Sequence, residues 1–142
     1  MIRANIPDRV LIDTCVVLDV LNGGEHARGS SRLLDLLGDE GRLVIDATII
    51  GELSPSIPTP NRLDRVLPPE RVRRLPILPS AGFPAARAFA AYRTRGGAKT
   101  TTLCDFLIGG HAEVAGLTIL TRDVNRFRTY FPSVPLITPD DA

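Results

Sequence analysis

Short apolar runs alternate with longer stretches of helical periodicity along the chain, and this alternation constrains the fold more than any other feature. Residues 9–13 (RVLID) and 42–46 (RLVID) are typical of short buried strands, and each ends in an aspartate that is followed by a helical pattern. Parallel strands need long crossover connections, which helices provide. We therefore expect a single domain over residues 1–142, built as a three-layer α/β/α sandwich around a short central parallel sheet.

The expected elements follow one another in a regular order. Strands are expected over residues 9–13, 42–46, 74–78, 117–121 and 134–138, and helices over residues 14–21, 30–37, 47–53, 61–66, 84–93, 102–115 and 124–131. Pro76 cannot donate to a ladder, so the third strand is expected at a sheet edge. Gly116 follows the strongest helical pattern and is expected to end that helix. Ligands of such sheets bind beyond the carboxyl ends of the strands, so functional residues are expected just after the strands.

Composition and cysteine spacing exclude several classes of protein. The chain has 44% hydrophobic and 23% charged residues, which is an ordinary balance for a globular domain. No apolar run approaches the roughly 18–20 residues that span a bilayer, and the first residues lack the apolar core of a secretory signal, so we expect a cytoplasmic location and no membrane contact. Cys15 and Cys104 have neither zinc-ligand spacing nor a disulfide framework, and both are expected to be reduced and largely buried.

Four carboxylates lie at or soon after the strand ends. Asp13 ends the first strand, Glu52 lies in the helix after the second, Asp105 opens the strongest helix and Asp123 follows the fourth strand. Each could instead be a helix cap or a surface residue. Their apolar neighbours favour partial burial, where a carboxylate is costly unless it is paired or bound to a metal. Oxygen ligands without nearby His or Cys favour Mg²⁺ or Mn²⁺ over zinc.

These four acids and their neighbours resemble the motifs of PIN-domain proteins. The matching segments are VLIDT at residues 10–14, IIGEL at 49–53, TLCDFLIGGHA at 102–112 and ILTRD at 119–123. No single motif is specific, but the four come in register and, with the closing strand, span residues 10–139. The compact length is similar to that of VapC-type toxins of toxin–antitoxin pairs.

The resemblance implies a Rossmann-like sandwich that hydrolyses RNA phosphodiester bonds with Mg²⁺, or with Mn²⁺ in its place. Asp13 and Asp105 would then be the metal ligands, Glu52 would bind a metal-held water or orient the nucleophile, and Asp123 would complete the site. The resemblance also implies inhibition by a small cognate antitoxin and a homodimer.

Other polar residues near the four acids are expected to have supporting or structural roles. Thr14, Thr121 and Arg122 are expected to contact the RNA or the metal-site carboxylates, although helix initiation and strand propensity explain the threonines equally well. Asp19 and Asp46 do not match the family's acids and are expected to be structural or peripheral. Because a metal activates water without a side-chain nucleophile, the two histidines, at positions 26 and 111, are expected to be bystanders.

Charge is unevenly distributed along the chain. Acidic side chains outnumber basic ones in residues 1–70, and basic ones predominate in residues 71–142. This asymmetry suits a protein that holds cations in one place and phosphates in another, but genomic composition is an equally simple explanation, since every basic residue except one is Arg. The basic residues that could follow an RNA path, or form only a solvated face, are Arg93, Arg95, Lys99, Arg122, Arg126 and Arg128.

Three classes of function remain to be separated. The first is a metal-dependent endoribonuclease, and the second is a non-catalytic PIN-like module that binds RNA or a protein. The third is a carboxylate-dependent phosphatase or phosphoacceptor, which is disfavoured because the first strand ends in Asp13-Thr-Cys rather than Asp-x-Asp. A nucleotide-fuelled enzyme is disfavoured because the sequence contains no phosphate-binding loop.

Overall fold

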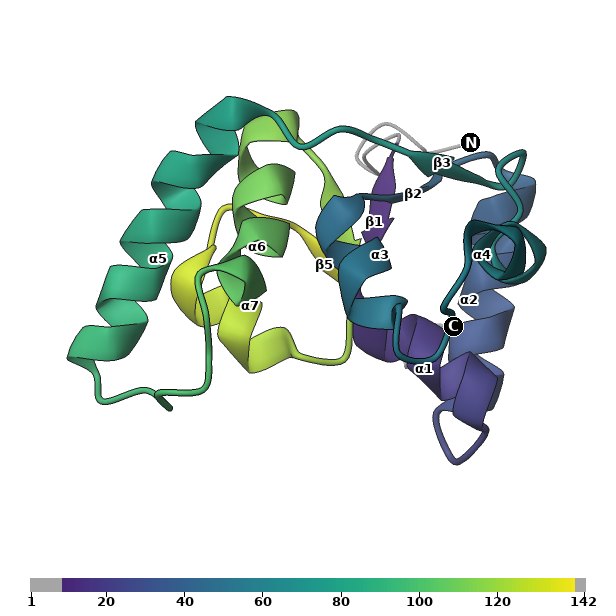
Figure 1. Cartoon of the computed structure of the whole chain (residues 1–142), viewed down its shortest axis with the longest axis horizontal. Coiled ribbons are helices and arrows are strands. Elements are labelled where there is room, and N and C mark those ends of the chain that lie inside the picture. Colours follow the sequence, from purple (N-terminus) through teal and green to yellow (C-terminus); the bar gives the residue numbers. More distant parts are fainter. Residues whose placement is uncertain (1–8, 140–142) are drawn as a thin grey trace.

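The computed structural model describes residues 9–139, in which five strands form one parallel sheet in the order β3-β2-β1-β4-β5 (Figure 1). The strands are β1 (Val10–Ile12), β2 (Leu43–Ile45), β3 (Val72–Arg74), β4 (Thr118–Leu120) and β5 (Leu136–Ile137). The central strand β1 pairs with β2 on one side and β4 on the other. The expected α/β/α sandwich with a short parallel sheet is confirmed.

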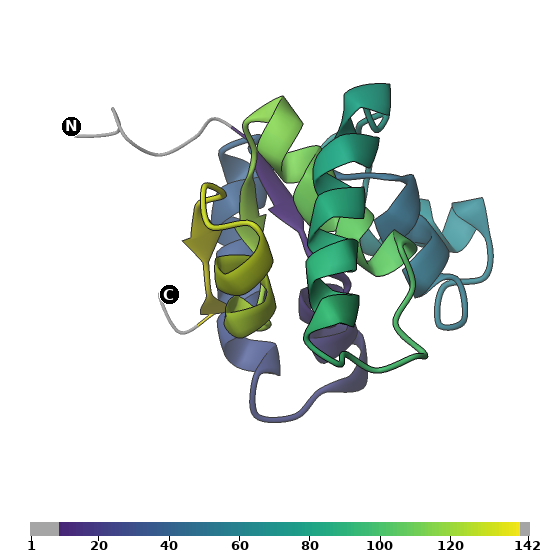
Figure 2. The same cartoon turned by 90° about the vertical axis from the view of Figure 1, so that its left-hand side faces the viewer.

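Helices cover both faces of this sheet. They are α1 (Thr14–Asn22), α2 (Ala27–Asp39), α3 (Ala47–Leu53), α4 (Pro60–Val66), α5 (Gly82–Thr94), α6 (Cys104–Ala115) and α7 (Val124–Tyr130), with a short 3₁₀ turn at Pro79–Ala81. Helix α1 packs against α2, α5 runs along α6, and α3 contacts both α1 and α6. Figure 2 shows α2 on one side of β1 and α3, α5 and α6 on the other. No helix within residues 9–139 is long and apolar enough to cross a membrane.

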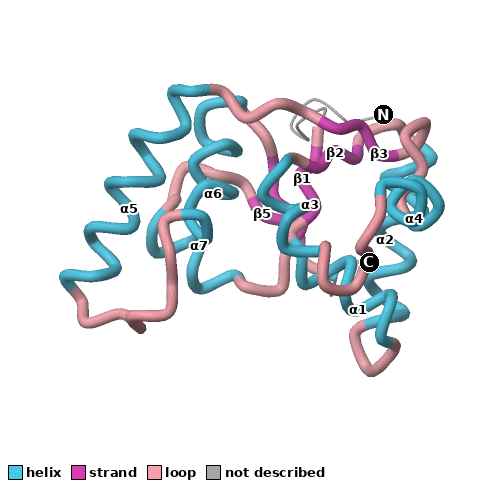
Figure 3. The backbone as a smooth tube through the Cα atoms, viewed as in Figure 1, coloured by secondary structure: helices cyan, strands magenta, loops and turns pink. Residues whose placement is uncertain are grey.

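The core lies on both faces of the central strands. Every residue of β1 is fully buried, which explains why its sequence is a continuous apolar run rather than an alternating one. Phe106 on α6 is also fully buried, and the rings of Phe89, Tyr92, Tyr130 and Phe131 surround it at centroid distances of 5.3–6.4 Å. Figure 3 shows the strands gathered at the centre, with the helices and loops around them.

The edge strand β3 lies earlier in the chain than the sequence predicted. Its edge position is confirmed, but it occupies Val72–Arg74 and not residues 74–78. The pairing with β2 puts Val72 opposite Leu43, and the Leu75 N–H donates to the Ile45 carbonyl at 2.8 Å. The next residue is Pro76, which has no N–H to continue the ladder, so the strand ends before the segment that the sequence favoured.

The expectation for the cysteines was half wrong. Both thiols are free, but Cys15 is only half-buried and Cys104 is exposed. Cys104 is the first residue of α6, where the inward face is already filled by Phe106 and Ile108. The predicted end of this helix is confirmed, because Gly116 takes the left-handed conformation (φ 67°) that glycine adopts at low cost.

Candidate functional site

Asp13 is the buried centre of the candidate site. It follows β1 directly, caps α1, and is 8% exposed. Its Oδ1 accepts the Thr14 N–H at 2.9 Å, and its Oδ2 accepts the Thr121 hydroxyl at 2.7 Å and the Cys15 thiol at 3.5 Å. Burial raises the pKa of Asp13, and the negative charge of Asp123 raises it further, although the three hydrogen bonds oppose this shift. No Lys, Arg or His among residues 9–139 forms an ion pair with this carboxylate.

Thr121 joins Asp13 to the segment that carries Asp123. While its hydroxyl donates to Asp13, its Oγ1 accepts the backbone N–H of Asp123 at 2.9 Å. The half-buried carboxylate of Asp123 forms an ion pair with Arg126 at 3.2 Å, one helical turn further along α7. The predicted residues Asp13, Thr121 and Asp123 therefore do meet, at the carboxyl ends of the adjacent strands β1 and β4.

Glu52 reaches the same centre from α3. The hydroxyl of Thr14 donates to its Oε1 at 3.1 Å, which ties α3 to the first turn of α1. Glu52 is exposed as a residue, yet neighbouring protein atoms desolvate its carboxylate enough to raise its pKa, and repulsion from Asp13 and Asp105 adds to the effect. Glu52 is thus within the electrostatic field of both other acids.

Asp105 lies in the first turn of α6, and its carboxylate binds back to Thr102, the residue before the N-cap residue Leu103. Its Oδ2 accepts the Thr102 backbone N–H at 2.6 Å and the Thr102 hydroxyl at 3.3 Å. This is only the reciprocal half of the capping box that the Thr-x-x-Asp spacing allowed, because the Thr102 hydroxyl donates to Asp105 and accepts no N–H of the helix. Oδ1 accepts no hydrogen bond within residues 9–139, so the bonds to Thr102 and metal ligation do not exclude each other.

The donor set suits a hard divalent cation, although the acids are spread out. In the described part of the chain, no three His, Cys, Asp or Glu side chains stand close enough together to hold one ion. Thr14 bonds to the carboxylates of Asp13 and Glu52, and Thr121 bonds to the Asp13 carboxylate and to the backbone N–H of Asp123. Burial raises the pKa of both Asp13 and Glu52, and repulsion between neighbouring acids adds to the shift, while Arg126 opposes it at Glu52. Carboxylate and hydroxyl oxygens fit Mg²⁺ or Mn²⁺ in chemistry and charge.

Arg122 lies beside the site but is engaged elsewhere. Its Nε and one terminal nitrogen bind the two carboxylate oxygens of Asp19 at 2.6 and 2.8 Å, a bidentate pair that joins the end of β4 to α1. Asp19 also accepts the Ser30 hydroxyl at 3.4 Å and so links α1 to α2. Asp19 is therefore structural, as expected, and the role of Arg122 toward RNA stays a prediction.

A buried pair behind the site went unrecognised in the sequence. Asp46 Oδ2 and His111 Nδ1 are 2.7 Å apart, and both side chains are at most 1% exposed. Asp46 Oδ1 also caps α3 by accepting the Ile49 N–H at 3.1 Å. Of the two roles expected for Asp46, structural or peripheral, the structure supports the structural one. His111, expected to be a bystander, is its buried partner. The sequence signal was an aspartate in the strand-end position equivalent to that of Asp13, and a histidine between the small and apolar residues Gly110 and Ala112 of α6.

Thr121→Val is expected to lower the free energy of unfolding by about 1–2 kcal/mol at neutral pH, because it removes a donor to a buried carboxylate and an acceptor for the Asp123 N–H. The loss should be smaller below the pKa of Asp13, where the carboxyl is protonated and needs that donor less. Urea unfolding at neutral pH and at a pH below the pKa of Asp13 measures the two losses of stability. Thr129→Val on the exposed face of α7 is the matched control. Equal losses at both pH values would contradict this account of Asp13.

Comparisons with known proteins agree with this architecture. A family model described as the PIN domain matches residues 10–131. The structure of VapBC2 from Rickettsia felis bound to a promoter DNA fragment is 18% identical over 91% of this chain and 97% of that one, with a TM-score of 0.69. The structure of FitAcB from Neisseria gonorrhoeae is 23% identical over 94% of this chain and 99% of that one, with a TM-score of 0.67. The structure of VapBC-1 from nontypeable Haemophilus influenzae is 17% identical over 92% of this chain and 98% of that one, with a TM-score of 0.68. At these identities the likeness is one of fold, and no curated protein sequence matches the chain significantly.

Proposed function

Because this chain belongs to the PIN-domain family, we propose that it is a metal-dependent endoribonuclease and acts as the toxin of a type II toxin–antitoxin pair. The observation that carries the proposal is the buried Asp13 carboxylate, which has no cationic partner within residues 9–139. Thr14 links it to Glu52, and Thr121 links it to the Asp123 segment. A carboxylate that serves only as a helix cap would not need two further acids held near it.

Each acid has a distinct part in the proposed reaction. When bound, a divalent ion neutralises the attacked phosphate and lowers the pKa of a water molecule. Asp13 and Asp105 would hold this ion, Asp13 from the end of β1 and Asp105 through Oδ1, which its bonds to Thr102 leave open. Thr14 fixes Glu52 through Oε1, so the other oxygen can accept a proton from the attacking water. Desolvation by neighbouring protein atoms, the largest cause of the raised pKa of Glu52, favours proton uptake by this carboxylate.

Asp123 would complete the charge of the site. Its partner Arg126 also lies over the Phe106 ring at 6.0 Å, so both members of the ion pair are held against α6. In this arrangement Arg126 can contact an RNA phosphate while Asp123 supports the ion. Thr14 could make the substrate contact expected of it through the second lone pair of its hydroxyl. Thr121 is fully buried, and its hydroxyl bonds to Asp13 and to the Asp123 N–H, so it positions the carboxylates and is not proposed to touch RNA.

The decisive experiment is incubation of the purified protein with total RNA, with EDTA, Mg²⁺ or Mn²⁺, followed by mapping of the cut ends. We expect cleavage at a limited set of single-stranded sites, only with metal, and its loss in Asp105→Asn. RNA binding without cleavage under every metal condition would favour the non-catalytic binding module. Cleavage that persists in EDTA would contradict the assigned role of the carboxylates.

We also propose that a cognate antitoxin silences the enzyme at the same carboxylates. The structural neighbours include protein pairs, among them a toxin–antitoxin complex from Klebsiella pneumoniae. Neither Asp13 nor Glu52 forms an ion pair within residues 9–139, so an arginine from such a partner could pair with both. A cognate partner that leaves metal binding and cleavage unchanged would contradict this mode of inhibition, and the homodimer stays a prediction.

A further inference from the structure

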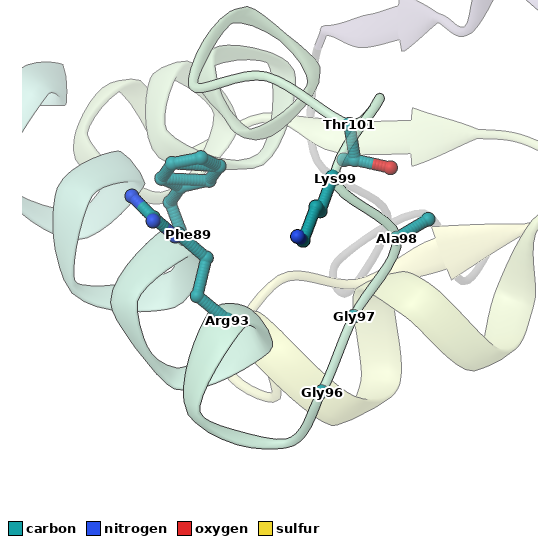
Figure 4. Close-up of a pocket in the computed structure, with 7 residues that line it drawn as sticks. All are labelled: Phe89, Arg93, Gly96, Gly97, Ala98, Lys99 and Thr101. Carbon is teal, nitrogen blue, oxygen red and sulfur yellow. The ribbon is translucent and has the colours of Figure 1, made fainter.

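A pocket of about 640 Å³ lies between the second half of α5 and the loop that leads to α6 (Figure 4). Phe89 and Arg93 form its helical wall, and Lys99 and Thr101 form its loop wall. We infer that this pocket binds one nucleotide of single-stranded RNA beside the carboxylates. The identity of the polymer rests on the proposed function, whereas the pocket itself and its charge do not.

The pocket is held open by bonds within the loop. The N–H groups of Gly96 and Gly97 donate to the Arg93 and Tyr92 carbonyls at 3.0 Å each, and the Ala98 N–H donates to the Tyr92 hydroxyl at 2.8 Å. A Cβ on Gly97 would clash with the Tyr92 ring, so only glycine lets the loop approach this closely. These contacts fix the loop before any ligand arrives, which lowers the entropic cost of binding.

The residues that line the pocket suit a ligand that combines an anionic group with an aromatic ring. Arg93 and Lys99 are both exposed, and neither forms an ion pair within residues 9–139. None of the residues that line the pocket is acidic. The Arg93 guanidinium lies over the Phe89 ring at 5.7 Å, which holds its plane ready to stack against a base while its N–H groups meet a phosphate. Figure 4 shows Arg93 beside Phe89 on the helix and Lys99 on the loop opposite.

The position of the pocket relates it to the candidate active site. Thr101 lines the pocket, and the next residue, Thr102, donates its N–H to Asp105 Oδ2 at 2.6 Å. The Phe89 ring packs on Phe106, the residue after Asp105, at 5.6 Å between centroids. An RNA strand whose phosphate lies at Asp105 can therefore place a neighbouring nucleotide in the pocket. A base inside a duplex is stacked and paired, so only a single strand can enter.

The test compares binding and cleavage of one fluorescent single-stranded oligoribonucleotide by the whole protein. Binding is measured by anisotropy in EDTA, and cleavage is measured with Mn²⁺. The variants are Arg93→Ala and Lys99→Ala, and the matched control is Arg73→Ala, which removes the same charge from the exposed edge strand β3. We expect each pocket variant to weaken binding by about 5- to 10-fold and to reduce the slope of log affinity against log salt by about 0.7, as the loss of one phosphate contact should. The control and a duplex probe should show neither change.

The outcomes separate this inference from the proposed function. If the wild type cleaves and the pocket variants bind and cleave equally well, the pocket inference is overturned and the nuclease proposal stands. If the wild type binds single strands through Arg93 and Lys99 but cleaves them under none of the metal conditions, the pocket inference stands and the nuclease proposal falls. Equal weakening in Arg73→Ala, or equal competition by a polyglutamate peptide, would show that charge alone is recognised and would overturn the inference.

Discussion

Asp13→Asn is expected to lower metal-dependent RNA cleavage by about 10³-fold, because it removes the negative charge proposed to anchor the ion at the developing phosphate charge. The amide keeps the shape of the carboxylate and can still accept the Thr14 N–H. Its NH₂ group can donate to Thr121, whose oxygen has a second lone pair. The loss of activity should therefore occur without unfolding.

The same substitution should leave stability unchanged or raise it in metal-free protein. Burial raises the pKa of Asp13 above its ordinary value, so the folded state favours the protonated form. A group with a raised folded pKa stabilises the protein fully below its unfolded pKa, and this contribution is lost as pH rises through the folded pKa. At neutral pH the charged Asp13 therefore lowers the free energy of unfolding, and asparagine removes this destabilisation. Residues kept for function at the expense of stability behave in this way.

Thermal unfolding at two pH values, with and without Mg²⁺, measures these effects. The melting temperature of the wild type should rise with Mg²⁺, more at high than at low pH, since the ion competes with protons for the carboxylates. Asp13→Asn should lose this response and should start from an equal or higher melting temperature without metal. Asp35→Asn makes the same chemical change on the exposed face of α2 and should behave as the wild type. Normal cleavage by Asp13→Asn would remove the basis of the proposed function.

The fold was predictable because its signals are local. Each local pattern predicts the structure of its own segment: the apolar runs predict the central strands, the helical periods predict the helices between them, and Gly116 predicts a helix end. The parallel direction of the strands follows from the helices that connect them. The edge strand was misplaced because pairing with β2 decides its position. Val72 and Arg74 carry no strand signal of their own that outweighs the apolar residues after them.

The sequence placed the four acids relative to the strands but gave no geometry for them. Chain order and strand ends identified Asp13, Glu52, Asp105 and Asp123 as candidates, and the resemblance assigned their roles, which stay predictions. The hydroxyl bridges through Thr14 and Thr121 depend on distances between segments far apart in the sequence, which no local pattern encodes. The bond between Arg122 and Asp19 also depends on tertiary structure, since 103 positions separate the two residues.

The bond between Asp46 and His111 leads to the largest expected effect on stability. His111→Leu should lower the free energy of unfolding by about 2–3 kcal/mol, because it leaves Asp46 Oδ2 buried with no hydrogen-bond donor. Leucine fills a similar volume, so the loss reports on the polar contact more than on a cavity. Asp46→Asn should cost less, since its amide can donate to the imidazole and its carbonyl can still cap α3.

A double-mutant cycle separates this bond from general damage to the core. His111→Leu combined with Asp46→Ala should cost less than the sum of the two single changes by at least about 1 kcal/mol in urea unfolding. His111 lies on α6 with Asp105, and Asp46 caps α3, the helix of Glu52, so the pair sets the distance between two of the proposed catalytic acids. Cleavage by a folded His111→Leu protein should therefore fall through kcat more than through KM. Additive stability costs, with unchanged kcat, would show that α3 and α6 are positioned by apolar packing alone.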